Sequence, residues 1–127
     1  MNPVFKEMIW GGTKLKESYG KKTDLDIVAE SWELSTHPDG ESVVTTGPYA
    51  GMKLSEYVNA LGKDCLGTKG NAFEFFPILI KFIDAKQPLS IQVHPDNEYA
   101  LRVEKEYGKT EMWYVLDCEE GASLYFG

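Results

Sequence analysis

The 127-residue chain has little of what several protein classes require. Its two cysteines, Cys65 and Cys118, are too few for a disulfide framework, and their spacing is unlike that of a metal-binding knuckle. No run approaches the roughly 18–20 apolar residues of a membrane span, and the first 19 residues contain no secretory hydrophobic stretch. We therefore expect a soluble, cytoplasmic protein with no membrane partner.

Arginine is almost absent, since Arg102 is the only one, and the net charge is −7. Residues 1–23 carry five Lys and two Glu, so the remainder carries eight basic and eighteen acidic side chains, a net charge of −10. An acidic surface repels nucleic acid, so no nucleic-acid partner is expected. Phosphate is normally held by Arg, Lys or helix N-termini. An anionic substrate would therefore have to be bound by lysines and backbone amides, or part of the binding site is absent from these residues.

Short apolar and β-branched segments between turn residues predict a mainly β chain. The turn sequence His37-Pro38-Asp39-Gly40 predicts a hairpin, and Glu119-Glu120-Gly121 predicts a second tight turn. Such a pattern fits a sandwich, jelly roll or barrel better than a parallel sheet. The expected strands cover residues 27–35, 42–46, 75–83 (buried), 89–94 (alternating, with one face in the core), 111–117 and 122–126.

Two short helices interrupt this pattern. The first covers residues 55–61, with Ser55 as the expected N-cap and Gly62 as the stop. The second is expected to start at Pro95-Asp96 and to end near Tyr107.

The two ends of the chain carry their own expectations. Residues 1–23 predict an extended N-terminal segment. Residues 124–127 fall inside an apolar strand with no polar tail, which is unusual for a finished domain. The exposed edge of such a strand favours pairing with another chain, so we expect self-association there.

Three polar side chains form a candidate metal site. Gln92 and His94 are two residues apart on an expected strand, so both point to one face, about 6.5–7 Å apart along the chain. Glu111 follows 17 residues later, after a helix and a glycine that can return it beside His94. Imidazole, carboxylate and carboxamide oxygen suit zinc or another divalent ion. Spacing alone leaves open a simple surface hydrogen-bonded pair.

Two lysines have unusual positions. Lys81 interrupts an apolar strand, so its ammonium must reach a cavity, an acid or solvent; snorkelling to an edge is the alternative. Lys109 lies two residues before Glu111 and can place a cation beside that carboxylate. Trp10, Trp32 and Trp113 are interpreted as packing anchors rather than ligand-stacking groups.

Several segments resemble the type I phosphomannose isomerases, and most closely the short bacterial form. The most specific are QVHPDN within residues 89–97 and KTEMWYVL within residues 108–116, together with residues 77–85. Residues 10–12 and 30–35 are similar to that family's N-terminal motifs. The resemblance covers nearly the whole chain.

The resemblance implies a partial cupin-type jelly roll and zinc-dependent aldose–ketose isomerisation of mannose 6-phosphate and fructose 6-phosphate. Family members continue further and supply the last metal-binding His and an active-site Arg. Residues 1–127 then form the N-terminal part of a cupin-type isomerase domain, with the fourth ligand of a single zinc outside the chain. The alternative is a catalytically incomplete metal- or sugar-binding cupin module. By position, the implied roles are metal ligands for Gln92, His94 and Glu111, proton transfer for Lys109, and substrate binding for Lys81 and Ser90.

Overall fold

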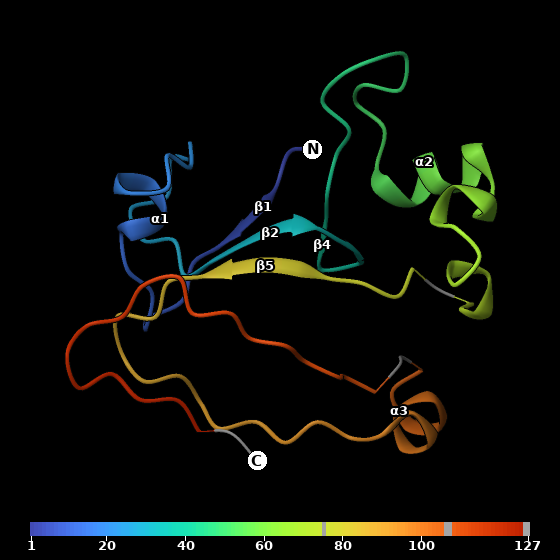
Figure 1. Ribbon diagram of the computed structural model, residues 1–127. Helices are drawn as coiled ribbons and strands as arrows, with labels where there is room; N and C mark the ends of the chain where they lie inside the picture. The colour runs from blue at the N-terminus through green and yellow to red at the C-terminus, as the bar shows by residue number, and fades with distance from the viewer. Residues whose placement is uncertain (75, 106–107, 126–127) are drawn as a thin grey trace. The chain divides into compact units, whose positions relative to one another are not determined.

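The computed structural model describes residues 1–74, 76–105 and 108–125 as two units, Met1–Leu89 and Ser90–Gly127, which we treat separately (Figure 1). Among the described residues, no helix is long and apolar enough to cross a bilayer. The first unit contains β1 (Val4–Lys6), α1 (Lys14–Glu17), β2 (Glu30–Leu34), β3 (Thr36–His37), β4 (Gly40–Glu41), α2 (Leu54–Leu61), the 3-10 helices η1 (Lys63–Leu66) and η2 (Gly70–Ala72), and β5 (Ile80–Ile83); the second contains α3 (Asn97–Val103).

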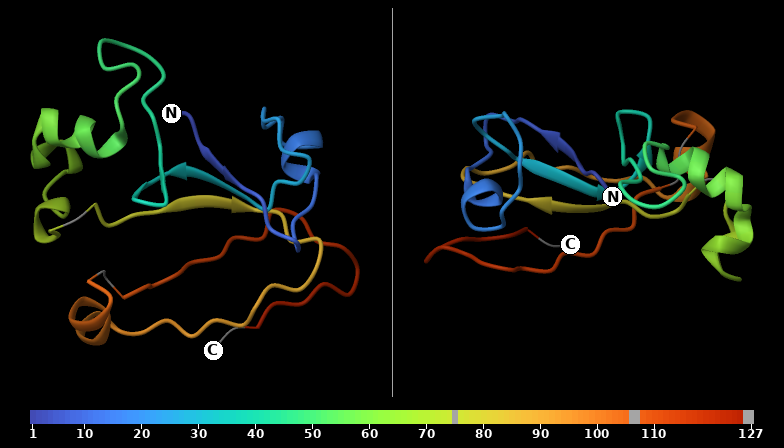
Figure 2. Two further views of the ribbon diagram at one scale, coloured as in Figure 1. Left: turned by 180° about the vertical axis from the view of Figure 1, so that it is seen from behind. Right: turned by 90° about the horizontal axis from the view of Figure 1, so that it is seen from above.

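A three-stranded antiparallel sheet organises the first unit, with β2 between β1 and β5 (Figures 1 and 2). Its register places Lys81 opposite Trp32 and Phe82 opposite Ser31. Because side chains alternate along a strand, Trp32, Lys81 and Glu30 share one face, and Ser31 and Phe82 share the other. The sheet therefore gathers polar and charged groups on the first of these faces.

The opposite face is covered by the segment around α1. Leu15, Val28 and Ala29 are almost fully buried, and the ring of Tyr19 stacks on that of Phe82 with centroids 6.1 Å apart. The start of α1 is tied to the end of β5, because Asp84 Oδ2 accepts the backbone N–H of Lys14 over 2.7 Å. The expected extended N-terminal segment is wrong for α1 alone: residues 1–23 contain the extended strand β1, which belongs to the sheet, and also the helical turn α1.

The hairpin expected at residues 37–40 is confirmed, since Thr36 pairs with Glu41 and His37 with Gly40. The returning strand ends at Glu41, earlier than expected, and Val43 makes only isolated bridges. The β-branched sequence of residues 42–46 favours extended backbone, but a strand also needs a neighbouring strand that pairs with it continuously.

The helix expected over residues 55–61 is α2, with one correction at its start. It begins at Leu54 with Lys53 as N-cap, so Ser55 lies inside the helix. The Glu56 carboxylate accepts the N–H of Lys53 over 3.1 Å and satisfies a donor at the helix start. Gly62 ends the helix at φ 80°, as expected.

The strand expected over residues 75–83 is shorter and more exposed than its composition indicates. β5 begins only at Ile80, after Pro77, and Phe75 lies outside the described residues. Ile78 and Ile80 are about half exposed, because β5 lies at the edge of the described sheet rather than at its centre. Proline has no N–H for a sheet ladder, which explains the late start.

In the second unit, α3 begins where expected. The Asp96 side chain accepts the N–H of Tyr99 over 2.9 Å, which caps the helix. The helix ends at Val103, earlier than expected, and Lys105 adopts a left-handed φ of 62°. Tyr107 lies outside the described residues.

The segments on either side of α3 are not strands, contrary to expectation. No strand is found within the described parts of 89–94, 111–117 or 122–126, although the turn at 119–121 forms as expected. Ile91 and Val93, expected in a core, are 78% and 92% exposed. Alternation buries one face of a segment only where another layer packs on it. Residues 126–127 lie outside the described part, so self-association there stays a prediction.

Candidate functional site

The loop after α3 returns to the start of that helix. Gly108 donates its N–H to Asn97 Oδ1 over 2.9 Å, beside the His94-Pro95-Asp96 segment. A Cβ at position 108 would lie 2.6 Å from the carbonyl oxygen of Pro95, so only glycine allows this approach. The contact joins the segments before and after the helix, and it brings Glu111 back to His94 as the sequence indicated.

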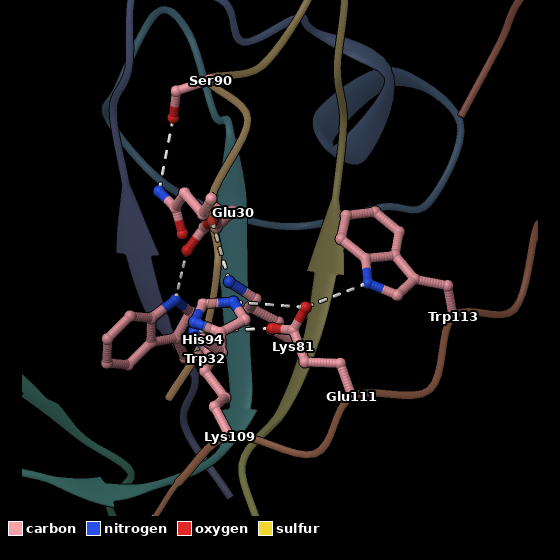
Figure 3. Close-up of polar contacts among 9 residues, drawn as sticks. Glu30, Trp32, Lys81, Ser90, His94, Lys109, Glu111 and Trp113 are labelled. Atoms are coloured by element: carbon pink, nitrogen blue, oxygen red, sulfur yellow. Dashed lines mark hydrogen bonds and ion pairs between the residues drawn. The ribbon is translucent and has the colours of Figure 1, made fainter. Parts of the chain in front are cut away.

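His94 and Glu111 face each other in the second unit. His94 Nε2 lies 3.6 Å from Glu111 Oε2, with both side chains half-buried (Figure 3). Zinc bonds to nitrogen and oxygen are about 2.0–2.2 Å long, so two ligands of one tetrahedral ion lie roughly 3.3–3.6 Å apart. The observed pair fits this separation and the donor chemistry of zinc.

Two neighbours of Glu111 favour its charged form. Lys109 Nζ lies 3.5 Å from Glu111 Oε1, and the Trp113 indole donates to Oε2 over 3.3 Å. Burial alone raises the pKa of Glu111, but the Trp113 hydrogen bond and the positive charges of Lys109 and His94 together lower this pKa below its ordinary value. Glu111 is therefore ionised at neutral pH, as a metal ligand must be.

Gln92 forms a hydrogen bond with Ser90. Its Nε2 donates to Ser90 Oγ over 3.3 Å, and both residues are exposed. The carboxamide oxygen, the atom through which an amide side chain can bind a metal, is on the other branch of the amide. Among the described residues, no group of three His, Cys, Asp or Glu side chains could hold a metal ion. The His94–Glu111 pair thus needs an amide oxygen or an additional group to complete a site.

In the first unit, Lys81 reaches an acid. Its Nζ donates to Glu30 Oε1 over 3.0 Å, and the Trp32 indole donates to Glu30 Oε2 over 2.6 Å (Figure 3). The sequence indicates an acid as one of three destinations for Lys81 but does not single out Glu30. The available signal was the Glu30-Ser31-Trp32 spacing, which places both polar groups on one strand face.

Comparison with a solved protein identifies the class. The structure is similar to the crystal structure of the mannose 6-phosphate isomerase from Bacillus subtilis, with a TM-score of 0.81 and 42% sequence identity. The match covers 94% of this chain and 38% of the Bacillus subtilis chain. The expected fold class, mainly β of the cupin type with short helices, is thereby confirmed as part of a larger fold. More specifically, residues 1–122 match the model "Phosphomannose isomerase type I, catalytic domain", so the chain belongs to this family.

Curated relatives are also isomerases by name. The chain is 43% identical over 128 residues to the putative mannose-6-phosphate isomerase YvyI of Bacillus subtilis, covering 100% of this chain and 40% of the relative. It is 44% identical over 119 residues to the mannose-6-phosphate isomerase of Streptococcus mutans, covering 94% and 37% respectively. The chain therefore spans about 40% of the length of these relatives.

Proposed function

We propose that residues 1–127 form the N-terminal part of a cupin-type isomerase domain that interconverts mannose 6-phosphate and fructose 6-phosphate. The observation that carries this proposal is the 3.6 Å separation of His94 Nε2 and Glu111 Oε2 in a member of the type I family. The separation and the donor types suit one divalent ion.

In this proposal, His94, Glu111 and the carboxamide oxygen of Gln92 hold one zinc, with a fourth ligand from outside these residues. The bound zinc would supply a positive charge that stabilises developing negative charge on the sugar oxygens. Ionised Glu111 and neutral His94 are the forms that bind metal. Trp113 and Lys109 support the ionised form of Glu111.

Lys109 is the proposed catalytic residue. Isomerisation of an aldose to a ketose moves a proton between C1 and C2 of the open-chain sugar, which requires a positioned base and acid. Lys109 Nζ lies 3.5 Å from Glu111 Oε1, so its nitrogen is beside a proposed metal ligand. A deprotonated Lys109 would accept the proton from one carbon and return it to the other.

Ser90 and Lys81 are proposed to bind the substrate. A serine hydroxyl and a lysine ammonium are both donors to phosphate oxygens. Lys81 carries one of the few cations in the acidic part of the chain, which suits a sugar phosphate. The cytoplasmic location expected from the composition is part of the same proposal.

The test measures zinc stoichiometry and isomerase activity for the 127-residue chain, alone and mixed with the C-terminal remainder of the Bacillus subtilis enzyme. One zinc per chain, with activity alone or in the mixture, supports the proposal. Tight zinc or sugar phosphate binding without activity in either sample supports the alternative, a catalytically incomplete metal- or sugar-binding module. Absence of zinc binding and of activity contradicts the isomerase proposal.

A further inference from the structure

We infer that Glu30 is a positioning residue that fixes the ammonium group of Lys81 for the substrate phosphate. The phosphate part of this inference rests on the proposed function, which assigns Lys81 to the substrate. The contacts that carry the positioning part all lie within the first unit.

Both oxygens of Glu30 are held by different donors. Oε2 accepts from the Trp32 indole over 2.6 Å, and Oε1 accepts from Lys81 Nζ over 3.0 Å (Figure 3). Glu30 is only 8% exposed, and a buried carboxylate is costly to leave without its donors. Rotation of the carboxylate would break at least one of these bonds, so Trp32 fixes Glu30 and Glu30 in turn fixes Lys81.

The sheet register creates this arrangement. Lys81 lies opposite Trp32 in the β2–β5 pairing, and Glu30 is two residues before Trp32 on the same face. Lys81 is therefore a diagonal neighbour of Glu30, a separation that long side chains span. An ammonium group has three N–H donors, so its bond to Glu30 still allows donation to a bound anion.

Trp32 is itself held from several sides. Lys6 Nζ lies 4.7 Å from the centroid of the indole, and the His37 ring meets the indole edge-on at 5.6 Å. A Cβ at Gly40 would lie 3.1 Å from Trp32 Cε3, so this glycine makes room for the ring. The indole that orients Glu30 is thus a fixed part of the first unit.

Lys81 places a half-buried cation in the otherwise apolar strand β5. Replacing a buried ion pair by apolar groups is often neutral or stabilising, so such a pair is weak evidence for a stabilising role. A lysine oriented by a buried carboxylate is instead suited to present its charge to an anion at one place. The geometry therefore points to a role for Glu30 in substrate binding, exerted through Lys81.

The chain contains a matched control for this pair. Lys21 Nζ lies 2.6 Å from Glu33 Oε1, and Glu33 is on the same strand as Glu30 but on the other face. The two lysine side chains are exposed to a similar degree, 19% for Lys21 and 21% for Lys81, whereas the Glu33 side chain, at 26%, is more exposed than that of Glu30, at 10%. Glu33→Gln therefore removes a comparable ion pair without touching Lys81.

The first experiment follows lysine ammonium groups by nitrogen-15 NMR in the 127-residue chain without ligand. We expect Glu30→Gln to lower the order parameter of the Lys81 ammonium to that of exposed Lys53, and Trp32→Phe to lower it partly. Glu33→Gln should leave Lys81 unchanged. An unchanged Lys81 order parameter in Glu30→Gln would overturn the positioning role, whatever the isomerase assay shows.

The second experiment titrates fructose 6-phosphate into the zinc-loaded chain. We expect Glu30→Gln to weaken binding about tenfold, as loss of a charge-assisted contact implies, and Glu33→Gln to change it less than about twofold. In a Lys81→Gln background, Glu30→Gln should add no further loss, because it acts through Lys81. Additive losses would overturn the inference. Absence of binding by the unsubstituted chain would instead refute the sugar phosphate role, and the NMR experiment would still decide the positioning.

Discussion

His94 Nε2 and Glu111 Oε2 lie 3.6 Å apart although the two residues are 17 positions apart in the chain. The separation exceeds a hydrogen bond and matches that of two ligands on one zinc ion. Gly108 and Asn97 make this approach possible by closing the segment that contains α3. The pair and its closing contact can be tested independently.

Removing either member of the pair should abolish tight zinc binding. We expect His94→Ala and Glu111→Gln each to weaken zinc affinity by more than about 100-fold, since loss of a group that only hydrogen-bonds to a metal ligand already costs about 10–100-fold. Chelator competition measures the affinity. His37→Ala is the control, because His37 is the last residue of β3 in the first unit. An equal loss in His37→Ala, or none in His94→Ala, would contradict the assignment.

Gly108→Ala should damage the same site through the backbone. The added Cβ would meet the Pro95 carbonyl at 2.6 Å, so the loop must move away from the helix start. We expect a loss of about 1–3 kcal/mol in the free energy of unfolding and about tenfold weaker zinc binding.

Gly121→Ala serves to separate the loss of stability from the loss of zinc binding. Gly121 has φ +82°, and a Cβ there meets nothing within 4 Å, so the substitution introduces backbone strain alone. It should destabilise the chain without weakening zinc binding, as denaturant unfolding and chelator competition can show. Zinc binding that falls equally in both variants would mean that the Asn97–Gly108 contact has no special role.

The pKa of Glu111 should respond to the Trp113 indole. Because this pKa is lowered in the folded chain, the stability it contributes is present above the ordinary carboxyl pKa and is lost as pH falls through the lowered value. Trp113→Phe removes a hydrogen bond to the carboxylate, so we expect the pKa to rise toward its ordinary value. Carbon-13 NMR titration of the zinc-free chain measures it. Tyr114→Phe, at an exposed neighbour, should leave it unchanged; equal shifts in both variants would exclude the indole as the cause.

Local chemistry made parts of this structure predictable. The turn at Pro38-Asp39-Gly40 and the start of α3 depend on residues adjacent in sequence: the hairpin forms as expected, and the structure adds that Asp96 caps the expected helix. The alternation of residues 89–94 indicates which side chains share a face but cannot supply a partner strand, and the expected strand is not found.

The candidate site also contains one contact that the sequence predicts and one that it does not. His94 and Glu111 could be brought together in advance because a helix and a glycine between them imply a return of the chain. The Glu30–Lys81 contact spans 51 residues and depends on the register between β2 and β5. No local pattern encodes that register, so Glu30 was missed although Lys81 was recognised as unusual.

Lys109→Met should reduce turnover with little change in substrate affinity. A general acid–base group contributes about 10²–10⁴-fold to rate, so we expect kcat to fall by at least about 100-fold in the isomerase formed with the C-terminal remainder of the Bacillus subtilis enzyme. Lys105→Met is the control, because the Lys105 ammonium donates to the carbonyl of Arg102 in the same unit. Zinc stoichiometry should be measured in both variants, since Lys109 also neighbours Glu111. Near-normal turnover of zinc-loaded Lys109→Met would remove this lysine from proton transfer.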